Sequence, residues 1–410
     1  MVTTPSQSQQ LTAIQANVAA IRQELNARFL ERSREIDALF VAAISRQHLV
    51  FVGDAGEAKS AVTEAFTARI TGSTYFKTQI FAQTTADEID GPFDIPALEQ
   101  GHLRRQTATY MPEATVAYLD EIWNGGPALL NGLLMKLNER EFRNDGQVHT
   151  IPLEMCIGSS NRMPQQADDR GQDLRALQDR FALWLIVPTL SDGGHRQFMT
   201  DELLRRKARA RKENTTGRAG TTISLDELHI LQQAALEVEI PADVLETWYE
   251  IRDQLAQKRY PKPSTRRSGW LLDLVCAHTI LFGRTTATAD DLTILQHALW
   301  QRPDDARAVA ALVVGVANPI LAKAQELYDL VQSVSEECIV FHVNPSNGKA
   351  EKRTKVIEAR QNISNLGREL TALRDQARGA GRDPSQIETM IVQAREKHRQ
   401  VTKLEGGDAF

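Results

Sequence analysis

The stretch HLVFVGDAGEAKS, residues 48–60, decides how this chain folds. Its apolar run Leu49–Val52 is short and rich in β-branched residues, which is typical of a strand buried in a parallel sheet. Residues 53–56 then turn the chain, and Lys59 and Ser60 open a run of good helix formers. A strand, a glycine-bearing turn and a helix are therefore expected in immediate succession.

This order of elements predicts a phosphate-binding loop. Backbone N–H groups of the turn and the positive end of the helix dipole both face an anion placed there. Lys59 would reach the β- and γ-phosphates of a nucleotide, and the Ser60 hydroxyl would bind Mg²⁺. The predicted nucleotide-binding residues of the loop are Gly53, Asp54, Ala55, Gly56, Glu57, Ala58, Lys59, Ser60 and Ala61.

Ala58 departs from the usual motif, in which a glycine precedes the lysine. The loop alone therefore leaves a second interpretation open, a helix that simply begins after a core strand. A second motif favours the phosphate loop: VAYLDEIW, residues 116–123, places two adjacent carboxylates after a buried strand. Asp120 would hold Mg²⁺ through its water shell, and Glu121 would orient and deprotonate the attacking water. The alternative for this acidic pair is a helix N-cap.

Further polar residues lie near the ends of predicted strands. Asn161 follows the strand Met155–Gly158, and Arg180 lies in residues 177–187, which have helix and then strand character. Because an open α/β sheet binds its ligand at the carboxyl ends of the strands, we expect one nucleotide pocket to gather these residues. Asn161 would place the lytic water or contact the γ-phosphate, and its alternative is an ordinary turn residue.

The composition is that of an ordinary soluble protein, and 410 residues allow two or three domains. A net charge of −5 provides no overall attraction to nucleic acid or to an anionic membrane. The cysteines Cys156, Cys276 and Cys338 are odd in number and widely spaced, which indicates neither a disulfide framework nor a metal cluster.

No run reaches the ~20 apolar residues that a membrane helix requires, and the first ten residues lack the apolar core of a signal peptide. We therefore expect a cytoplasmic protein.

Apolar spacing predicts the elements around these motifs. Residues 11–45 read as amphipathic helix that breaks near Arg32, and residues 127–141 as a helix with one buried side. The segment 87–112 reads as an inserted hairpin or loop and not as a helix. Residues 141–152 carry Asn-Asp-Gly between two strand-like arms, which predicts a β-hairpin.

These patterns divide the chain into three expected domains. Residues 1–190 form an α/β nucleotide-binding core with an N-terminal helix, residues 191–305 a helical lid, and residues 306–410 a helical extension. In the extension we expect a short β segment at 337–343 and a charged helical hairpin at 349–404.

The chain resembles the MoxR-type AAA+ ATPases, and within them most closely the RavA branch. The segments that carry the resemblance are RFLERSREIDALFVAAISRQHLVFVGDAGEAKS, GHLRRQTATYMPEATVAYLDEIWNGGPALLNGLLMKLNEREFRNDG, SSNRMP, LQDRFALWL and STRR. The resemblance implies an AAA+ parallel sheet sandwiched by helices, an all-α lid and a ring assembly, usually hexameric. It also implies that the segments 87–112 and 141–152 face the pore or the upper surface of the ring.

The resemblance assigns roles to individual residues. Lys59 and Ser60 match the Walker A pair, Asp120 and Glu121 the Walker B pair, and Asn161 matches sensor 1.

Two further roles fall on arginines. Arg180 matches the arginine finger that reaches the neighbouring subunit, with Arg170 and Arg175 as alternatives. Arg266 matches sensor 2 of the lid, with Arg267 as its alternative.

The chain departs from the RavA pattern after about residue 340, where no compact β domain can be identified. A partner particular to that branch is therefore not implied, and the charged hairpin could form either a folded-back stalk or coiled-coil pairs with a neighbour. Irregular heptads favour the stalk.

We expect an Mg-ATP-hydrolysing ring ATPase that remodels or assembles protein clients, with a von Willebrand factor A domain protein as the partner that the resemblance implies. One alternative is a nucleic-acid motor, against which stand the acidic net charge and the lack of interleaved basic and aromatic residues. The basic segment 205–218 could touch a polyanion, although a solvated helix and loop is the favoured interpretation. A nucleotide-gated scaffold without catalysis is the third possibility.

Overall fold

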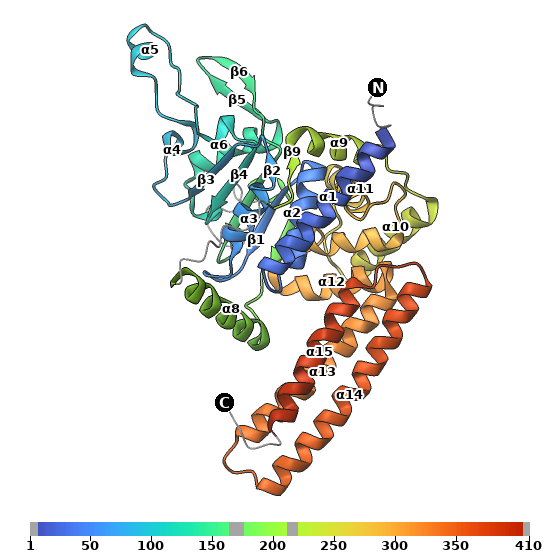
Figure 1. Ribbon diagram of the computed structural model, residues 1–410. Helices are drawn as coiled ribbons and strands as arrows, with labels where there is room; N and C mark the ends of the chain where they lie inside the picture. Colours follow the sequence, from blue (N-terminus) through green and yellow to red (C-terminus); the bar gives the residue numbers. More distant parts are fainter. Residues whose placement is uncertain (1–6, 164–175, 211–219, 405–410) are drawn as a thin grey trace, which may run out of the picture. The chain divides into compact units, whose positions relative to one another are not determined.

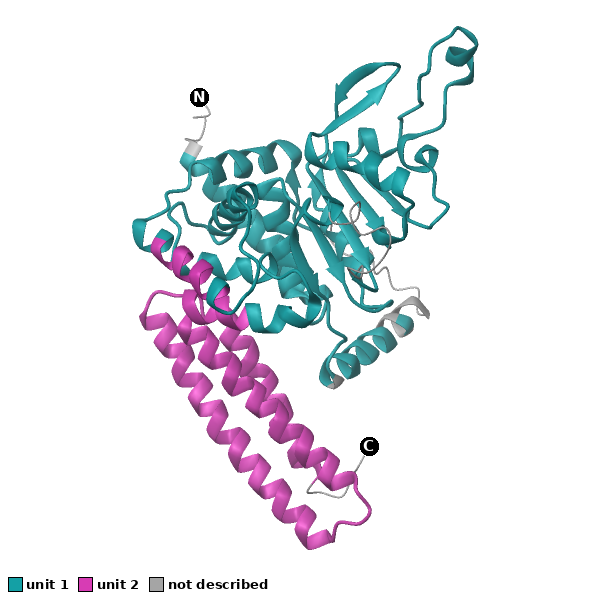
Figure 2. Cartoon of the chain, turned by 180° about the vertical axis from the view of Figure 1, so that it is seen from behind, with its two compact units in different colours: residues 1–245, 256–309 teal, residues 246–255, 310–410 magenta. Residues whose placement is uncertain are grey.

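The computed structural model of the chain describes residues 7–163, 176–210 and 220–404 (Figure 1). The chain forms two compact units (Figure 2). The first contains residues 1–245 and 256–309, and the second contains residues 246–255 and 310–410.

A five-stranded, all-parallel sheet forms the centre of the first unit, in the strand order β3-β4-β7-β1-β8. The strands are β1 (His48–Val52), β3 (Tyr75–Gln79), β4 (Val116–Asp120), β7 (Met155–Ser160) and β8 (Phe181–Ile186). All five residues of β1 are buried between β7 and β8. The prediction of a buried parallel strand before the phosphate loop is therefore confirmed.

Helices lie around this sheet, as the sequence predicted for an AAA+ core (Figure 1). They are α1 (Gln7–Arg28), α2 (Ser33–Ser45), α3 (Lys59–Thr67), α6 (Pro127–Asn138), α8 (Asp192–Ala210), α9 (Leu225–Leu236) and α11 (Thr265–Leu281), with the 3₁₀ segments η1 (Met111–Glu113), η2 (Ile122–Asn124) and η3 (Ala289–His297). The helices α10 (Ala242–Gln257) and α12 (Pro303–Ala317) each contain residues of both units. A two-residue ladder pairs β2 (Ile70–Thr71) with β9 (Ile223–Ser224). The N-terminal helical segment breaks where the sequence predicted, between α1 and α2.

No helix in the described parts of the chain has the length and apolarity needed to cross a membrane.

The inserted segment 87–112 is mostly irregular, but the prediction of no helix in it was wrong in two places. Single helical turns form at α4 (Ala86–Asp90) and α5 (Ile95–Glu99). Local caps explain both, because Thr85 and Glu88 make a capping box and the Asp94 side chain accepts a hydrogen bond from the Ala97 N–H. Such caps stabilise one turn of helix even where Gly and Pro are frequent.

The second insertion is the predicted hairpin, made of β5 (Glu141–Asn144) and β6 (Gln147–Thr150). Asp145 and Gly146 both have positive φ at its tip, as a two-residue hairpin turn requires. The tip is hydrogen-bonded to the first insertion, residues 87–112. The Asn144 side chain accepts from the Arg105 N–H at 2.7 Å, and the Asp145 side chain accepts from the Leu103 N–H at 2.9 Å.

The second unit contains three long helices that pack on one another: α13 (Pro319–Val343), α14 (Lys349–Gly379) and α15 (Ser385–Lys403). The helical hairpin predicted at 349–404 is confirmed. The β segment predicted at 337–343 was wrong, since these residues complete α13. Its apolar sequence has a β-like composition, but Val331, Ser335 and Cys338 recur at helical spacing and are buried in the core of the bundle. Tertiary packing thus overrides local propensity here.

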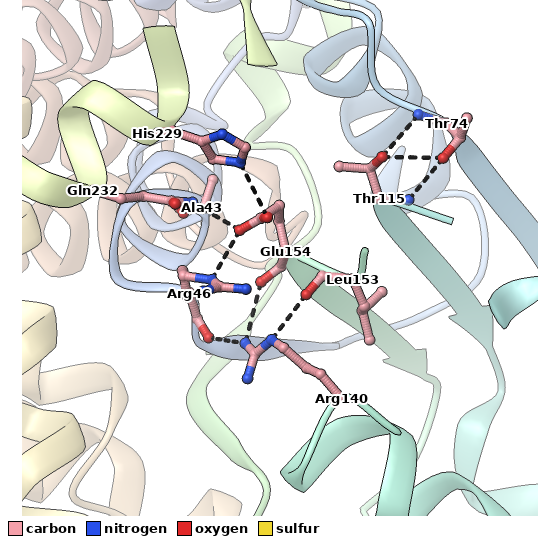
Figure 3. A network of polar contacts seen from close by, with 9 residues as sticks. All are labelled: Ala43, Arg46, Thr74, Thr115, Arg140, Leu153, Glu154, His229 and Gln232. Atoms are coloured by element: carbon pink, nitrogen blue, oxygen red, sulfur yellow. Dashed lines mark hydrogen bonds and ion pairs between the residues drawn. The ribbon is translucent and has the colours of Figure 1, made fainter. Parts of the chain in front are cut away.

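A buried carboxylate fastens the amino end of the sheet to the surrounding helices (Figure 3). Glu154, just before β7, accepts hydrogen bonds from Arg46 after α2 at 2.9 Å and from Gln232 of α9 at 3.0 Å. His229 of α9 lies 3.2 Å from its other oxygen. The guanidinium of Arg140 donates to the Leu153 carbonyl at 2.8 Å, and burial lowers the pKa of Arg140 to about 10. These contacts satisfy the polar groups at an end of the sheet that would otherwise be buried unpaired.

A second buried carboxylate, Asp291 of η3, organises the helices that follow α9. Its fully buried side chain accepts hydrogen bonds from His278 of α11 at 2.7 Å, from the guanidinium of Arg284 and from the Thr288 N–H at 2.8 Å. Burial alone would raise the pKa of Asp291, but the hydrogen bonds from His278 and Arg284 outweigh it and lower the pKa well below its ordinary value. The ionised carboxylate therefore stabilises the folded state.

We predict that Asp291→Asn lowers the stability of the protein by about 2–4 kcal/mol at pH 7, because it removes the buried ionised acceptor of the hydrogen bonds from His278 and Arg284. Since the folded-state pKa of Asp291 is depressed, this difference is complete above about pH 4 and shrinks as the pH falls further. Thermal melting of both proteins between pH 3 and pH 7 measures it. The exposed Asp304 is the control, and Asp304→Asn should change the melting midpoint little. An equal melting midpoint for wild type and Asp291→Asn at pH 7 would contradict this account.

Candidate nucleotide-binding site

The carboxyl ends of three neighbouring strands meet at one edge of the sheet. In the ladders of the sheet, Val52 of β1 pairs with Ser160 of β7, and Gly158 of β7 pairs with Leu119 of β4. Because all strands run parallel, the phosphate loop after β1, the acidic pair at the end of β4 and Asn161 after β7 lie at this one edge. The Gly53 N–H donates to the Ser160 carbonyl at 3.1 Å, which ties the loop to β7.

The backbone of the phosphate loop requires its unusual residues. A Cβ atom on Gly53 would lie 2.5 Å from the Val187 carbonyl oxygen, so only glycine fits there. Gly56 has φ +92°, and Ala58, directly before α3, has φ +61°. The usual motif has glycine at the position of Ala58 because an L-residue with left-handed φ costs about 1–2 kcal/mol. Ala58 keeps the loop conformation in spite of this cost.

The ammonium group of Lys59 lies at the centre of the site. It donates to the carbonyl oxygens of Gly53 and Asp54, the latter at 2.9 Å, and to Asn161 Oδ1 at 3.2 Å. Burial lowers the pKa of Lys59, and the nearby carboxylates of Asp120 and Glu121 act in the opposite direction. The structure therefore brings Lys59 together with the acidic pair and Asn161, as the sequence predicted.

A chain of hydroxyl groups positions Asp120. The Tyr118 hydroxyl donates to Ser159 Oγ at 2.8 Å, and Ser159 Oγ donates in turn to Asp120 Oδ1. Burial raises the pKa of Tyr118, so its hydroxyl stays protonated and remains a donor. Sequence reasoning missed Tyr118 and Ser159 as supports of the acidic residue. The available signal was the alternation of side chains along β4 and β7, which points Tyr118 and Asp120 to the same face of the sheet.

Glu121 takes a left-handed backbone conformation, with φ +52°, directly after β4. Its carboxylate lies 3.3 Å from Ser160 Oγ and 3.5 Å from the Asn161 N–H. A non-glycine residue in this conformation stores backbone strain, and such strain is common at functional sites. The conformation turns the Glu121 side chain toward the end of β7 and Asn161.

Arg32, between α1 and α2, contacts Glu57 of the phosphate loop. It was not predicted as a site residue. Its side chain is 3% exposed and forms an ion pair with Glu57 of the loop at 2.7 Å. It also donates to the Glu31 carbonyl at 3.0 Å. No local sequence pattern marks this role of Arg32, because its partner Glu57 lies 25 residues later in the chain.

The donor set at this edge suits a magnesium–nucleotide. Mg²⁺ is usually held by one or two carboxylates together with substrate phosphates and waters, and not by an all-protein cage. Ser60 and Asp120 offer a hydroxyl and a carboxylate, while Lys59 and the start of α3 offer positive charge to phosphate oxygens. Within residues 7–163, 176–210 and 220–404, no group of three or more His, Cys, Asp or Glu side chains is placed so that it could hold a metal ion.

Arg180 does not join this pocket, which corrects the expectation that one pocket gathers all four strand-end residues. It precedes β8, whose first residue Phe181 pairs with His48 at the start of β1, so Arg180 lies at the amino edge of the sheet. The reason is its order in the chain: Arg180 enters a strand, whereas the other residues leave one. Its guanidinium lies 3.8 Å from Asp179. The alternatives Arg170 and Arg175 lie outside the described residues.

The two sensor 2 candidates differ in their surroundings. Arg267 is partly buried, donates to the Ala298 carbonyl at 2.8 Å and lies 3.7 Å from Asp179. Burial lowers the pKa of Arg267, and Asp179 partly offsets this shift. Arg266 is exposed at the start of α11. Arg180 and Arg267 thus share Asp179 at the amino edge of the sheet.

A five-stranded parallel sheet in this order, with a phosphate loop after β1 and an acidic pair after β4, defines the chain as an AAA+ ATPase core. Comparison with known proteins specifies the family. Residues 16–233 match the MoxR domain of the MoxR-vWA-beta-propeller ternary systems, and residues 243–313 match an AAA lid domain. The chain belongs to the MoxR family of AAA+ ATPases.

The chain is also similar to individual proteins and to solved structures. The uncharacterized protein MJ0079 of Methanocaldococcus jannaschii is 29% identical over 368 residues, which cover 90% of this chain and 92% of the relative. The uncharacterized protein MJ0812 of the same organism is 30% identical over 318 residues, covering 77% and 80%. Among solved structures, an assumed ATPase from Cytophaga hutchinsonii has the same fold, with a TM-score of 0.58 and 14% identity over 74% of this chain and 95% of its own.

We predict that Lys59→Ala abolishes nucleotide binding, because it removes the cation at the centre of the phosphate loop. Isothermal titration with Mg-ATP measures this effect. The matched control is Lys77→Ala, which removes an exposed lysine from β3 of the same sheet and should leave the affinity unchanged. Retained ATP affinity in Lys59→Ala would mean that the phosphate loop is misassigned.

Proposed function

We propose that the protein is an Mg-ATP-hydrolysing ring ATPase that remodels or assembles protein clients. The observation that carries this proposal is the position of Lys59 beside Asp120, Glu121 and Asn161 at one edge of the sheet. Mg-ATP bound there would supply the phosphoryl group and the charge that the loop neutralises. Lys59 and residues 53–61 would bind the phosphates, and Ser60 and Asp120 would hold the metal.

Glu121 and Asn161 would carry out the hydrolytic step together. Glu121 would accept a proton from the attacking water as general base, while Asn161 would hold that water or the γ-phosphate in line. The contacts of the Glu121 carboxylate with Ser160 and with the Asn161 N–H support this division, since they aim the base at the residue that would position the water.

The position of Arg180 supports an assembly in which each subunit contributes Arg180 to the nucleotide site of its neighbour. An arginine at the amino edge of its own sheet is remote from its own phosphate loop, so its guanidinium would act on the nucleotide of the next subunit. Hydrolysis would then require a ring, for which six copies are the expectation of the family resemblance. We assign the sensor 2 role to Arg266, because Arg267 is already held by Asp179 and the Ala298 carbonyl.

The two insertions, residues 87–112 and 141–152, are hydrogen-bonded to each other and are the parts that would contact a client. Ile95 and Leu103 of the first insertion are 60% and 59% exposed, which is unusual for large apolar side chains without a partner. A buried ion pair at 3.0 Å between Lys136 of α6 and Asp90 of α4 connects the helix after the acidic motif to the first insertion. Movement at the nucleotide site could therefore reach the client through α6.

We further propose a von Willebrand factor A domain protein as partner. The support is the description of the matching family model, which is named for systems that combine a MoxR domain, such a domain and a β-propeller. The RavA-like segments favour a position near that branch, but the helical second unit replaces the β domain of that branch, so its particular partner is not proposed.

We predict that Glu121→Gln binds Mg-ATP with unchanged affinity and loses at least about 100-fold in turnover, because a general base contributes 10²–10⁴-fold. Steady-state phosphate release and titration with ATP measure the two quantities. Glu113→Gln, which changes an exposed glutamate that precedes β4 in the sequence, is the control. Unchanged turnover in Glu121→Gln would favour the non-catalytic scaffold.

We predict that Arg180→Ala binds ATP but loses hydrolysis, and that mixing it with Glu121→Gln subunits restores part of the turnover. In mixed rings, a site that keeps Glu121 can receive Arg180 from its neighbour. Phosphate release over a series of mixing ratios measures the effect. If both variants assemble and no ratio restores activity, Arg180 does not act in the neighbouring site.

A further inference from the structure

The three-helix bundle of the second unit has a groove whose chemistry the ATPase function does not use. A cavity of about 370 Å³ lies between α14 and α15, and all of its lining residues come from these two helices. Its floor is apolar, formed by Ile363, Ile391 and Ala394. Since α13 packs on both α14 and α15, a groove that α13 does not line opens on the outer side of the bundle.

The rim of the groove is cationic. Arg368 stands on the α14 side, and Arg395 and Arg399 stand on the α15 side. No carboxylate occurs among the residues that line this cavity in the described bundle. An apolar floor between basic rims fits an amphipathic helix with acidic flanks.

Gly367 leaves room for a close approach to the groove. It lies inside the 31-residue helix α14, where glycine costs about 1 kcal/mol relative to alanine. A Cβ atom on Gly367 would meet nothing within 4 Å, so packing within this chain does not require glycine there. With Ser364 and Thr371 it forms a row of small residues along the groove, which would let a further helix approach closely.

The bundle itself carries a surface of complementary character. On α13 the residues Glu326, Leu330, Ser333, Glu337 and Val340 recur at alternating four- and three-residue spacing and form one face of the helix. We call this face the acidic stripe. Except for the small Ser333, its members are glutamates or large apolar residues, and all five are exposed. Spacing of this kind follows the seam of a left-handed helix pair, which is the geometry needed to lie along two other helices.

We propose that the groove between α14 and α15 receives the acidic stripe of α13 from a second copy of this chain. The stripe lies on α13 and the groove is lined only by α14 and α15, so the two surfaces share no residue and each copy can use both at once. Such a head-to-tail contact closes into a ring or continues as an array. Burial of Leu330 and Val340 on the apolar floor would supply affinity, while the arginine–glutamate pairs would set orientation and choice of partner. This contact does not depend on the proposed ATPase site.

Cross-linking of the full-length chain tests the contact directly. One preparation carries Leu330→Cys and another carries Ser364→Cys, and a flexible bis-maleimide spacer joins them without requiring an exact register. We expect an inter-copy product that is lost when Asn362→Cys, exposed on another side of α14, replaces Ser364→Cys. The chain without added cysteines gives the background from Cys276, since Cys156 and Cys338 are buried. A product no stronger than that background would overturn the proposal.

Charge reversal then identifies the occupant. A groove variant carries Arg368→Glu and Arg395→Glu, and a stripe variant carries Glu326→Arg and Glu337→Arg. Each variant alone should lose the cross-link, because like charges then face each other in every contact. Mixing the groove variant that carries Ser364→Cys with the stripe variant that carries Leu330→Cys should restore it, because the charges are again opposite. Restoration also shows that both variants are folded.

Two outcomes of the mixing experiment contradict the proposal. If the cross-link survives in either variant alone, the groove charges do not select the stripe. If both variants keep the helical circular dichroism of the wild type and mixing restores nothing, the groove serves a partner other than a second copy.

Discussion

The site depends on one electrostatic arrangement, the Lys59 ammonium held beside the carboxylates of Asp120 and Glu121 at the edge of a buried parallel sheet. Burial disfavours the charged lysine and lowers its pKa, and the two carboxylates offset part of that cost. The strand order brings the three groups together although they are far apart in the sequence, because β7 lies between β1 and β4 and connects both. A bound magnesium–nucleotide would enter a place where opposite charges already face each other.

Much of this site could be predicted from the sequence because strand ends in a parallel sheet share one edge. That rule placed Lys59, Asp120 and Asn161 correctly without knowledge of strand order. It failed for Arg180, because a residue that enters a strand lies at the opposite edge from residues that leave one. Supports such as Arg32 were missed, since their importance comes from contacts with residues distant in the chain, which no local pattern shows.

The errors in secondary structure have the same origin. The apolar end of α13 resembles a strand in composition, and only its packing against α14 makes it helical. Composition alone suggests irregular structure for the residues of α4 and α5. Each forms a helical turn because capping side chains satisfy backbone N–H groups near its start. Long periodic segments such as α14 and α15 were predicted well, because their buried residues repeat over many turns and leave one consistent face.

The central claim is that Lys59 and the acidic pair lie on either side of one metal–triphosphate. Crystals of the protein grown with Mn²⁺ and a non-hydrolysable ATP analogue test it through the anomalous scattering of manganese. The account predicts a single strong peak between Ser60 and Asp120, with Lys59 in contact with the β- or γ-phosphate. A metal bound elsewhere, or a triphosphate that Lys59 does not touch, would contradict it.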